Sequence, residues 1–450
     1  MTRRRALLAL TIGTAALFSA SPAQAHGIGG RADLPLSLSL VVYSAGGVLV
    51  VSFAALAWLW PRSRWETTPA GRPLPGWLDR AVHVAKWPVR LVGVGVLVAV
   101  MAAAYVGDTD VQRNFAPLAV YVLFWVGLFF FSAVLGNLWK AFGPVHALAR
   151  LVSRERAPYR LGHWPAALMI FGFTWLELVH PDAAEPRLLA IAMTVYLGVV
   201  LLGAAVWGRP WLDQGEGFGA LFGLVAAMAP VYQDDEGRLR LRPPLVGLTS
   251  VRTLPGTVAL VAVGLGSTTY DGLSRTAFYT DLIGDVGNMW LGTAGLLWTI
   301  AAVYALYRVG VAMIPYLAGV PREESDTDAT AAAFVHSLVP IALAYAIAHY
   351  FSLLVFEGQT AVALASDPLG RGWDLFGTAR WGISYSAVST RTIAYVQIGA
   401  VVLGHVAAVV LAHDRAVTRY PVKVATRSQY PLLAVMVGYT VGALLILLGG

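Results

Sequence analysis

Residues 334–359 read FVHSLVPIALAYAIAHYFSLLVFEGQ and decide the fold of the chain. The stretch is apolar and exceeds the length of about 20 residues that a helix needs to cross a bilayer. It nevertheless carries His336, Tyr345 and His349. Ionisable side chains are costly at membrane depth, so they usually face a protein interior or a wet cavity. Tyr345 and His349 share one helical stripe, whereas His336 lies on the opposite face unless Pro340 kinks the helix. The stretch predicts a reaction site or pathway in a membrane protein, or else a histidine bonded to a neighbouring helix.

The composition of the whole chain also indicates a membrane protein. Of its 450 residues, 57% are hydrophobic and only 13% are charged, and apolar runs of about 20 residues recur. Cysteine is absent from the sequence, which excludes disulfides, thiolate metal sites and cysteine nucleophiles. The net charge of +7 comes mostly from arginines. Their placement in loops indicates membrane topology and argues against nucleic-acid binding.

The first 25 residues have the pattern of a secretory signal peptide. Three arginines, Arg3–Arg5, precede an apolar run that ends near Ala20, and Ala23-Gln24-Ala25 fits a cleavage site. Cleavage there leaves one membrane domain, residues 26–450, and an uncleaved anchor helix is the alternative. A terminal His26 could chelate copper through its amine and imidazole, which makes copper a candidate ligand.

Ten apolar segments follow the signal and predict an all-α polytopic helix bundle in the lipid bilayer. The segments are roughly 37–60, 88–106, 115–137, 164–180, 187–207, 254–270, 287–310, 329–355, 394–412 and 431–449. Basic residues gather in every second loop, which predicts a plasma-membrane protein whose mature N-terminus is extracytoplasmic. Residues 217–231 are too short to cross and predict an interfacial or re-entrant helix. The DDEGRLRLRP run at 234–243 predicts a solvated hairpin or linker.

Polar residues gather at the outer ends of the predicted spans, where their convergence would form a membrane-embedded site. Glu177 and His180 have the i, i+3 spacing of one half of a bundle metal site. With Asp271 and His349 they would make a ligand set suited to zinc, manganese or iron, which could activate water for hydrolysis. A hydrogen-bonded helix end is the alternative for the Glu177–His180 pair.

A second group of histidines lies toward the inner ends of the spans. His336 and His405 are within predicted spans, and His413-Asp414 falls where the ninth span ends. Communication between the inner and outer histidines would relay protons or a metal, which favours a transporter. An interfacial anchor is the alternative for His413-Asp414, and a structural or assembly factor is a third class of function.

Five stretches resemble bacterial multi-pass proteins labelled fenitrothion hydrolase, which are similar to organophosphate hydrolases. The stretches are HGIGGRADLP at 26–35, GSTTYDGLSRTAF at 266–278, HSLVPIALAYAIAHYFSLLVFEGQ at 336–359, SDPLGRGWDLFGTA at 366–379 and GHVAAVVLAHDRA at 404–416. They extend over nearly the whole mature chain. The resemblance implies cleavage of a phosphotriester or thiophosphate ester, a small-molecule substrate, with release of a nitrophenol.

The residues and the resemblance together suggest roles for the outer group. We expect Asp271 and His349, with Glu177 or His180, to bind a metal or activate water. We expect Tyr270 or Tyr345 to stabilise the leaving oxygen or orient a ligand. The natural substrate, the identity of the metal and the oligomeric state are left open by the sequence.

Overall fold

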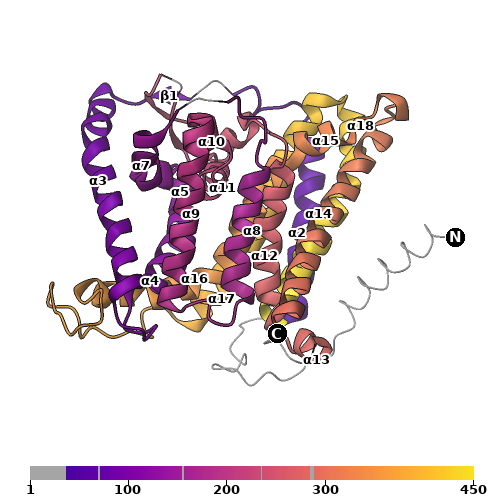
Figure 1. The fold of residues 1–450 in the computed structure, drawn as a ribbon. Coiled ribbons are helices and arrows are strands. Elements are labelled where there is room, and N and C mark those ends of the chain that lie inside the picture. Colours follow the sequence, from indigo (N-terminus) through magenta and orange to yellow (C-terminus); the bar gives the residue numbers. More distant parts are fainter. Residues whose placement is uncertain (1–36, 69–70, 155–156, 235, 284–287, 450) are drawn as a thin grey trace.

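The computed structural model describes residues 37–449 except 69–70, 155–156, 235 and 284–287 (Figure 1). The predicted signal peptide and His26 lie outside the described residues. Eight helices within them are long and apolar enough to cross a membrane. The prediction of an all-α polytopic bundle is therefore confirmed.

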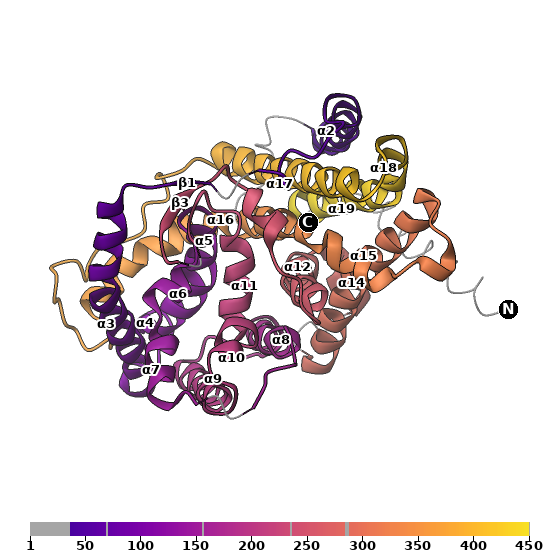
Figure 2. The same cartoon turned by 90° about the horizontal axis from the view of Figure 1, so that it is seen from above.

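Helices of 20 residues or more form the frame of the bundle, together with two that are shorter and lie among them (Figures 1 and 2). One of the long helices is the continuous helix of residues 115–135, which is described below. The others are α2 (Leu38–Leu59), α3 (Gly76–Val106), α9 (Pro186–Trp207), α14 (Met289–Ala318), α16 (Leu338–Ser366), α17 (Thr390–Arg419) and α19 (Tyr430–Gly449). The shorter two are α8 (Trp164–Val179) and α12 (Thr257–Ser274).

Helices occur at all ten predicted segments, but α8 and α12 are not among the eight that meet the length and hydropathy of a membrane span. With 16 residues, α8 is about 24 Å long, less than the hydrocarbon core of about 30 Å. The polar run Ser267–Tyr270 and Asp271 make α12 less apolar. Because α12 packs against α8, α14 and α16, it lies inside the bundle, where its polar side chains have neighbours other than lipid.

The predicted third span, residues 115–137, is one continuous helix with an unusual middle. It begins as α4 (Phe115–Pro117), continues as the π-helix η2 (Leu118–Leu128) and ends as α5 (Phe129–Leu135). Gly136, with φ +91°, ends it in a conformation that suits glycine. π-Helical turns are rare and occur frequently at functional sites, which directs attention to the residues beside η2.

The stretch that contains His336 is broken, though not at Pro340. Helix α15 (Thr327–Phe334) is separated from α16 by the 3₁₀ turn η5 (Val335–Ser337). Pro340 lies in the first turn of α16, where a missing backbone N–H costs no intrahelical bond. The break therefore changes the direction of the His336 side chain relative to α16, but it lies before Pro340 and is not caused by it.

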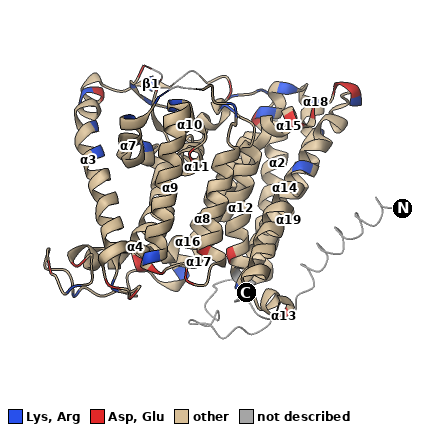
Figure 3. Ribbon diagram, in the orientation of Figure 1, with Lys and Arg blue, Asp and Glu red and all other residues tan. Residues whose placement is uncertain are grey.

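Short elements join the helices at one end of the bundle, where Lys and Arg are abundant (Figure 3). We call this the arginine-rich end; its loops are 60–75, 136–163, 208–256, 319–326 and 420–429. The elements are β1 (Arg72–Pro73), α6 (Leu138–Phe142), α7 (Pro144–Val152), α10 (Arg209–Gln214), α11 (Gly217–Ala226), β2 (Val231–Gln233), β3 (Leu239–Leu241), η3 (Val246–Ser250), η4 (Arg322–Glu324) and α18 (Val422–Ser428). The opposite end carries the short α13 (Ala277–Ile283).

The hairpin predicted at 234–243 is present. Strands β2 and β3 pair antiparallel with Tyr232 opposite Arg240, and β1 adds to the other edge of β3. The short helix expected within 217–231 is α11, most of whose side chains are buried. Seen from above, α11 lies in the middle of the molecule (Figure 2).

Helices α16 and α17 make a close approach in the bundle interior. A β-carbon at Gly404 of α17 would overlap the side chain of Ala344 and would lie 2.8 Å from the carbonyl oxygen of Pro340. Only glycine permits this spacing, so Gly404 fixes how closely the histidine-bearing helices α16 and α17 pack.

Candidate functional site

Asp271 of α12 and His349 of α16 meet inside the bundle. The Nε2 atom of His349 is 2.8 Å from Oδ2 of Asp271, and the hydroxyl of Tyr350 donates to the same oxygen at 2.9 Å. The guanidinium of Arg275 bonds the other oxygen, Oδ1, with Nη2 at 2.7 Å. The Asp271 side chain is only 4% exposed, so these partners replace the water that a buried carboxylate has lost.

Local sequence explains how this cluster forms. Arg275 follows Asp271 by four residues, so both side chains lie on one face of the helix end. Between them, Gly272 lets α12 and α16 approach, because a β-carbon there would lie 3.2 Å from the Tyr345 hydroxyl. The Arg275 side chain is 71% exposed, whereas that of His349 is 11% exposed. The cluster therefore reaches the surface through Arg275.

The hydrogen bond to Asp271 leaves one imidazole nitrogen of His349 available. In the neutral tautomer that donates Nε2–H to the carboxylate, Nδ1 carries the lone pair. This atom makes no hydrogen bond with any residue in the described part of the chain. A carboxylate that orients a histidine in this way is the arrangement by which hydrolytic sites prepare a general base.

A line of buried rings leads from His349 toward the middle of the bundle. The ring centroid of Tyr345 is 6.5 Å from that of His349 and 6.2 Å from that of Tyr439 on α19. Tyr439 lies 6.2 Å from His405 of α17 and is hydrogen-bonded to Thr269. The Tyr345 hydroxyl and the His405 Nε2 atom are buried and have no hydrogen-bond partner among the described residues. Burying a polar atom without a hydrogen bond lowers the stability of the fold, so such atoms mark places where water or a ligand is accommodated.

The remaining predicted outer residues take different positions. Glu177 lies close enough to Asp271 and Arg275 to interact with their charges, and its Oε2 atom is buried without a hydrogen-bond partner among the described residues. His180 caps the end of α8 and accepts from the backbone N–H of Asp182 at 3.1 Å. Tyr270 packs against Tyr279 of α13, with 6.0 Å between ring centroids. Glu177 thus borders the cluster, while Tyr270 and His180 contact other elements.

His336 and His413 do not join this line of rings. His336 is buried and lies within electrostatic range of Asp414 and Arg415 at the arginine-rich end. His413 bonds the carbonyl oxygen of Trp60 at 3.1 Å and the side chain of Gln429 at 3.2 Å. Both histidines therefore lie near the point where α17 reaches the arginine-rich end.

Asp414 has a structural role that the sequence did not reveal. Its carboxylate is fully buried and holds the loop after α2 through five donors. The donors are the Trp60 indole at 2.8 Å, the Ser63 hydroxyl at 2.9 Å, and the backbone N–H groups of Arg64 at 2.8 Å, Trp65 at 3.2 Å and Glu66 at 3.0 Å. The neighbouring Arg415 pairs with Glu66. The segment predicted as a possible interfacial anchor therefore ties a loop to α17.

The side chains expected to hold a metal are arranged as hydrogen-bond partners. Among the described residues, no three His, Asp or Glu side chains come together as a ligand group. Both oxygens of Asp271 already accept hydrogen bonds, and Nε2 of His349 is directed at one of them. Asp271 and His349 thus bond each other and do not point at a common centre, so this donor set does not fit a shared metal ion in the arrangement described.

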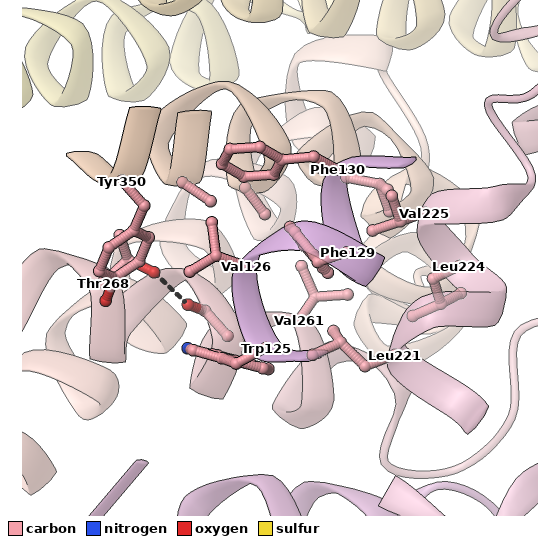
Figure 4. Close-up of a pocket in the computed structure, with 14 residues that line it drawn as sticks. Trp125, Val126, Phe129, Phe130, Leu221, Leu224, Val225, Val261, Thr268 and Tyr350 are labelled. Carbon is pink, nitrogen blue, oxygen red and sulfur yellow. Dashed lines mark hydrogen bonds between the residues drawn. The ribbon is translucent and has the colours of Figure 1, made fainter. Parts of the chain in front are cut away.

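A narrow crevice is lined in part by Tyr350, a member of the cluster (Figure 4). It lies between η2, α5, α11, α12 and α16 and has a volume of about 30 Å³. Its walls are apolar and aromatic, with Trp125, Phe129 and Phe130 from the third span. Tyr350 contributes its ring to the wall and its hydroxyl to Asp271, so it connects the crevice with the polar cluster.

Tyr350 and Arg275 were not among the residues predicted to form the site. Their positions carried a signal, since Tyr350 adjoins His349 and Arg275 follows Asp271 by one helical turn. Fold and cluster together define a polytopic helical membrane protein with a buried histidine–carboxylate pair. Comparison of the chain with protein-family models, curated proteins and solved structures finds no match.

Proposed function

We propose that this protein is a membrane-embedded hydrolase of hydrophobic organophosphate or thiophosphate esters. The observation that carries the proposal is the 2.8 Å contact between His349 Nε2 and Asp271 Oδ2 in the bundle interior. Asp271 holds the imidazole, and Nδ1 of His349 takes a proton from the attacking water. The new P–O bond forms as the bond between phosphorus and the aryloxide leaving group breaks. Arg275, fixed on Asp271 yet exposed, supplies positive charge where negative charge grows on the phosphoryl oxygens.

The walls near the cluster favour an apolar substrate. The crevice beside Tyr350 is lined by aromatic and aliphatic side chains, which suit an aryl or alkyl ester group better than a sugar or a nucleotide. Its small volume means that a substrate would enter only after the neighbouring side chains shift. The resemblance to proteins labelled fenitrothion hydrolase independently favours the same substrate class.

We also propose the side of the membrane on which the site opens. The basic loops meet at one end of the bundle, and the positive-inside rule assigns that end to the cytoplasm. Asp271 and Arg275 lie at the end of α12 that leads into α13, at the opposite end of the bundle. The site would then open on the extracytoplasmic side of the bacterial plasma membrane.

Nitrophenol release from fenitrothion by the purified protein in detergent tests the hydrolase. The proposal expects turnover without a membrane gradient and a loss of about 10²- to 10⁴-fold in His349→Gln, the usual effect of removing a general base. His180→Gln, also a histidine at the end of a helix, is the matched control and should keep full activity. Equal rates in the intact protein and in His349→Gln would refute the assignment. A chelator added to parallel samples tests whether turnover requires a divalent metal.

Proton handling is the second candidate, and the line of rings from His349 through Tyr345 and Tyr439 to His405 favours it. Buried imidazole and phenol groups in sequence can pass a proton through apolar surroundings. A proton path predicts that liposomes containing the protein lose an imposed pH gradient and that His405→Phe stops this loss. A hydrolase without proton transport predicts equal gradient decay in both proteins.

A further inference from the structure

Basic side chains gather where α3 passes α6 and α7, remote in the sequence from Asp271 and His349. The group consists of Lys86, Arg90, Lys140, Arg150 and Arg209; we call it the α3–α7 basic cluster. Lys86 lies within electrostatic range of the other four. Asp213 is the carboxylate that pairs with one of them, bonding Lys140 at 2.7 Å. The cluster therefore keeps a clear excess of positive charge.

Arg90 is the unusual member of this cluster. It is 6% exposed, and its Nε and Nη1 atoms are buried without a hydrogen-bond partner among the described residues. Gly143, with φ +50°, makes room for the guanidinium, because a β-carbon there would lie 3.3 Å from Arg90 Nε. A buried guanidinium with unpaired donors is costly unless an anion or water binds it.

Two arginines of the cluster lie near the ring of Trp87. The guanidinium carbon of Arg90 lies 5.8 Å from the Trp87 ring centroid, and that of Arg150 lies 5.4 Å from it. The charge of Arg150 acts on Arg90, and like charges repel each other, so an anion bound near both would stabilise the arrangement. Arginine forks suit phosphate oxygens in particular.

We propose that the α3–α7 basic cluster binds a phosphate group, with Arg90 as its buried ligand and Arg150 and Lys86 at its mouth. The surrounding surface favours a phospholipid headgroup as the source of that phosphate. Trp87 is 55% exposed, and Val84 and Leu91 lie on the same face of α3. Leu151, which follows Arg150, is exposed as well, so acyl chains could lie on these apolar side chains. Basic pockets between membrane helices are known to take anionic lipid headgroups.

Native mass spectrometry of the full chain in neutral detergent tests the proposal. The probes are phosphatidylglycerol, phosphatidylcholine with the same acyl chains, and inorganic phosphate. We expect one molecule of phosphatidylglycerol to bind and Arg90→Gln and Arg150→Gln each to weaken it about fivefold, the factor for about 1 kcal/mol per basic residue near anionic lipid. Arg80→Gln removes an exposed arginine from the same helix and should leave the affinity unchanged.

The probes separate the two sources of phosphate. Arginine-dependent binding of phosphatidylglycerol, in excess of phosphatidylcholine, supports a lipid site. Arginine-dependent binding of inorganic phosphate alone supports a site for a free phosphate. Affinities that are equal in the intact protein and in Arg150→Gln for every probe overturn the proposal. Because Arg150 is exposed, its variant carries the test if Arg90→Gln does not fold.

Discussion

Replacement of Asp414 with asparagine should release the loop of residues 60–66 from α17. The carboxylate accepts five hydrogen bonds from this loop, three of them from backbone N–H groups. An asparagine side chain keeps one acceptor oxygen and turns an NH₂ group toward donors. At least two bonds are therefore lost, and donors that had faced a buried carboxylate are left without a partner.

The size of the effect follows from the number of bonds lost. A hydrogen bond to a charged group contributes about 1.5–3 kcal/mol, so two lost bonds cost about 3–6 kcal/mol. Because 1.4 kcal/mol corresponds to a factor of ten, the open state of the loop should become at least about a hundredfold more populated. The rest of the bundle should stay folded, since loops open locally.

Limited trypsin digestion in detergent measures this opening. Arg62 and Arg64 lie in the loop and are exposed, and their cleavage rate follows the open population when opening is fast. Asp414→Asn should speed cleavage there about a hundredfold. Asp234→Asn changes a carboxylate that accepts backbone N–H groups in the β2–β3 hairpin, and it should leave these two sites unaffected. Unchanged cleavage in Asp414→Asn would refute the anchoring role.

Three further outcomes are expected. Burial lowers the pKa of His163 to about 4 from its ordinary value of 6.5. Between these two pH values the unfolded chain therefore binds more protons than the folded protein. The free energy of unfolding should fall by about 3 kcal/mol as the pH drops from 6.5 to 4. Denaturant unfolding should show a shallower pH dependence in His163→Gln. Gly404→Leu should lower the yield of folded protein, measured by gel filtration, because a side chain at position 404 overlaps Ala344. Gly438→Leu is the control and should leave the yield unchanged, because a β-carbon at position 438 meets open space. Tyr196→Phe removes a donor to buried Glu216 and should cost about 1–3 kcal/mol in thermal unfolding.

Much of the fold follows from the sequence, because a helix that crosses the hydrocarbon core of a bilayer needs about 20 apolar residues. Apolar segments of about 20 residues located helices at all ten predicted places, and basic loops identified which ends lie together. Helix ends were less predictable. Helix α3 begins at Gly76, 12 residues before the predicted start, because its first turns carry charges that lower the hydropathy without interrupting the helix.

The candidate site was predictable only in part. The sequence placed Asp271 and His349 toward the outer ends of spans but left open whether they meet, and the structure brings them together. The pairing of Asp414 with a loop some 350 positions earlier has no local signal, since it depends on how α2 and α17 pack. The burial of Arg90 could not be predicted from the sequence either, because an arginine near the end of a span normally indicates membrane topology.

Helix α11 constrains the order in which the protein can be assembled. Its 10 residues are too few to span the hydrocarbon core, and the Glu216 carboxylate at its start is buried with the Trp139 indole and two backbone N–H groups as partners. It contacts the earlier helices α5 and α8 and also α12 and α16, which are synthesised later. The packing around α11 is therefore complete only after α12 and α16 have been made, so this segment reaches its final surroundings well after its own synthesis.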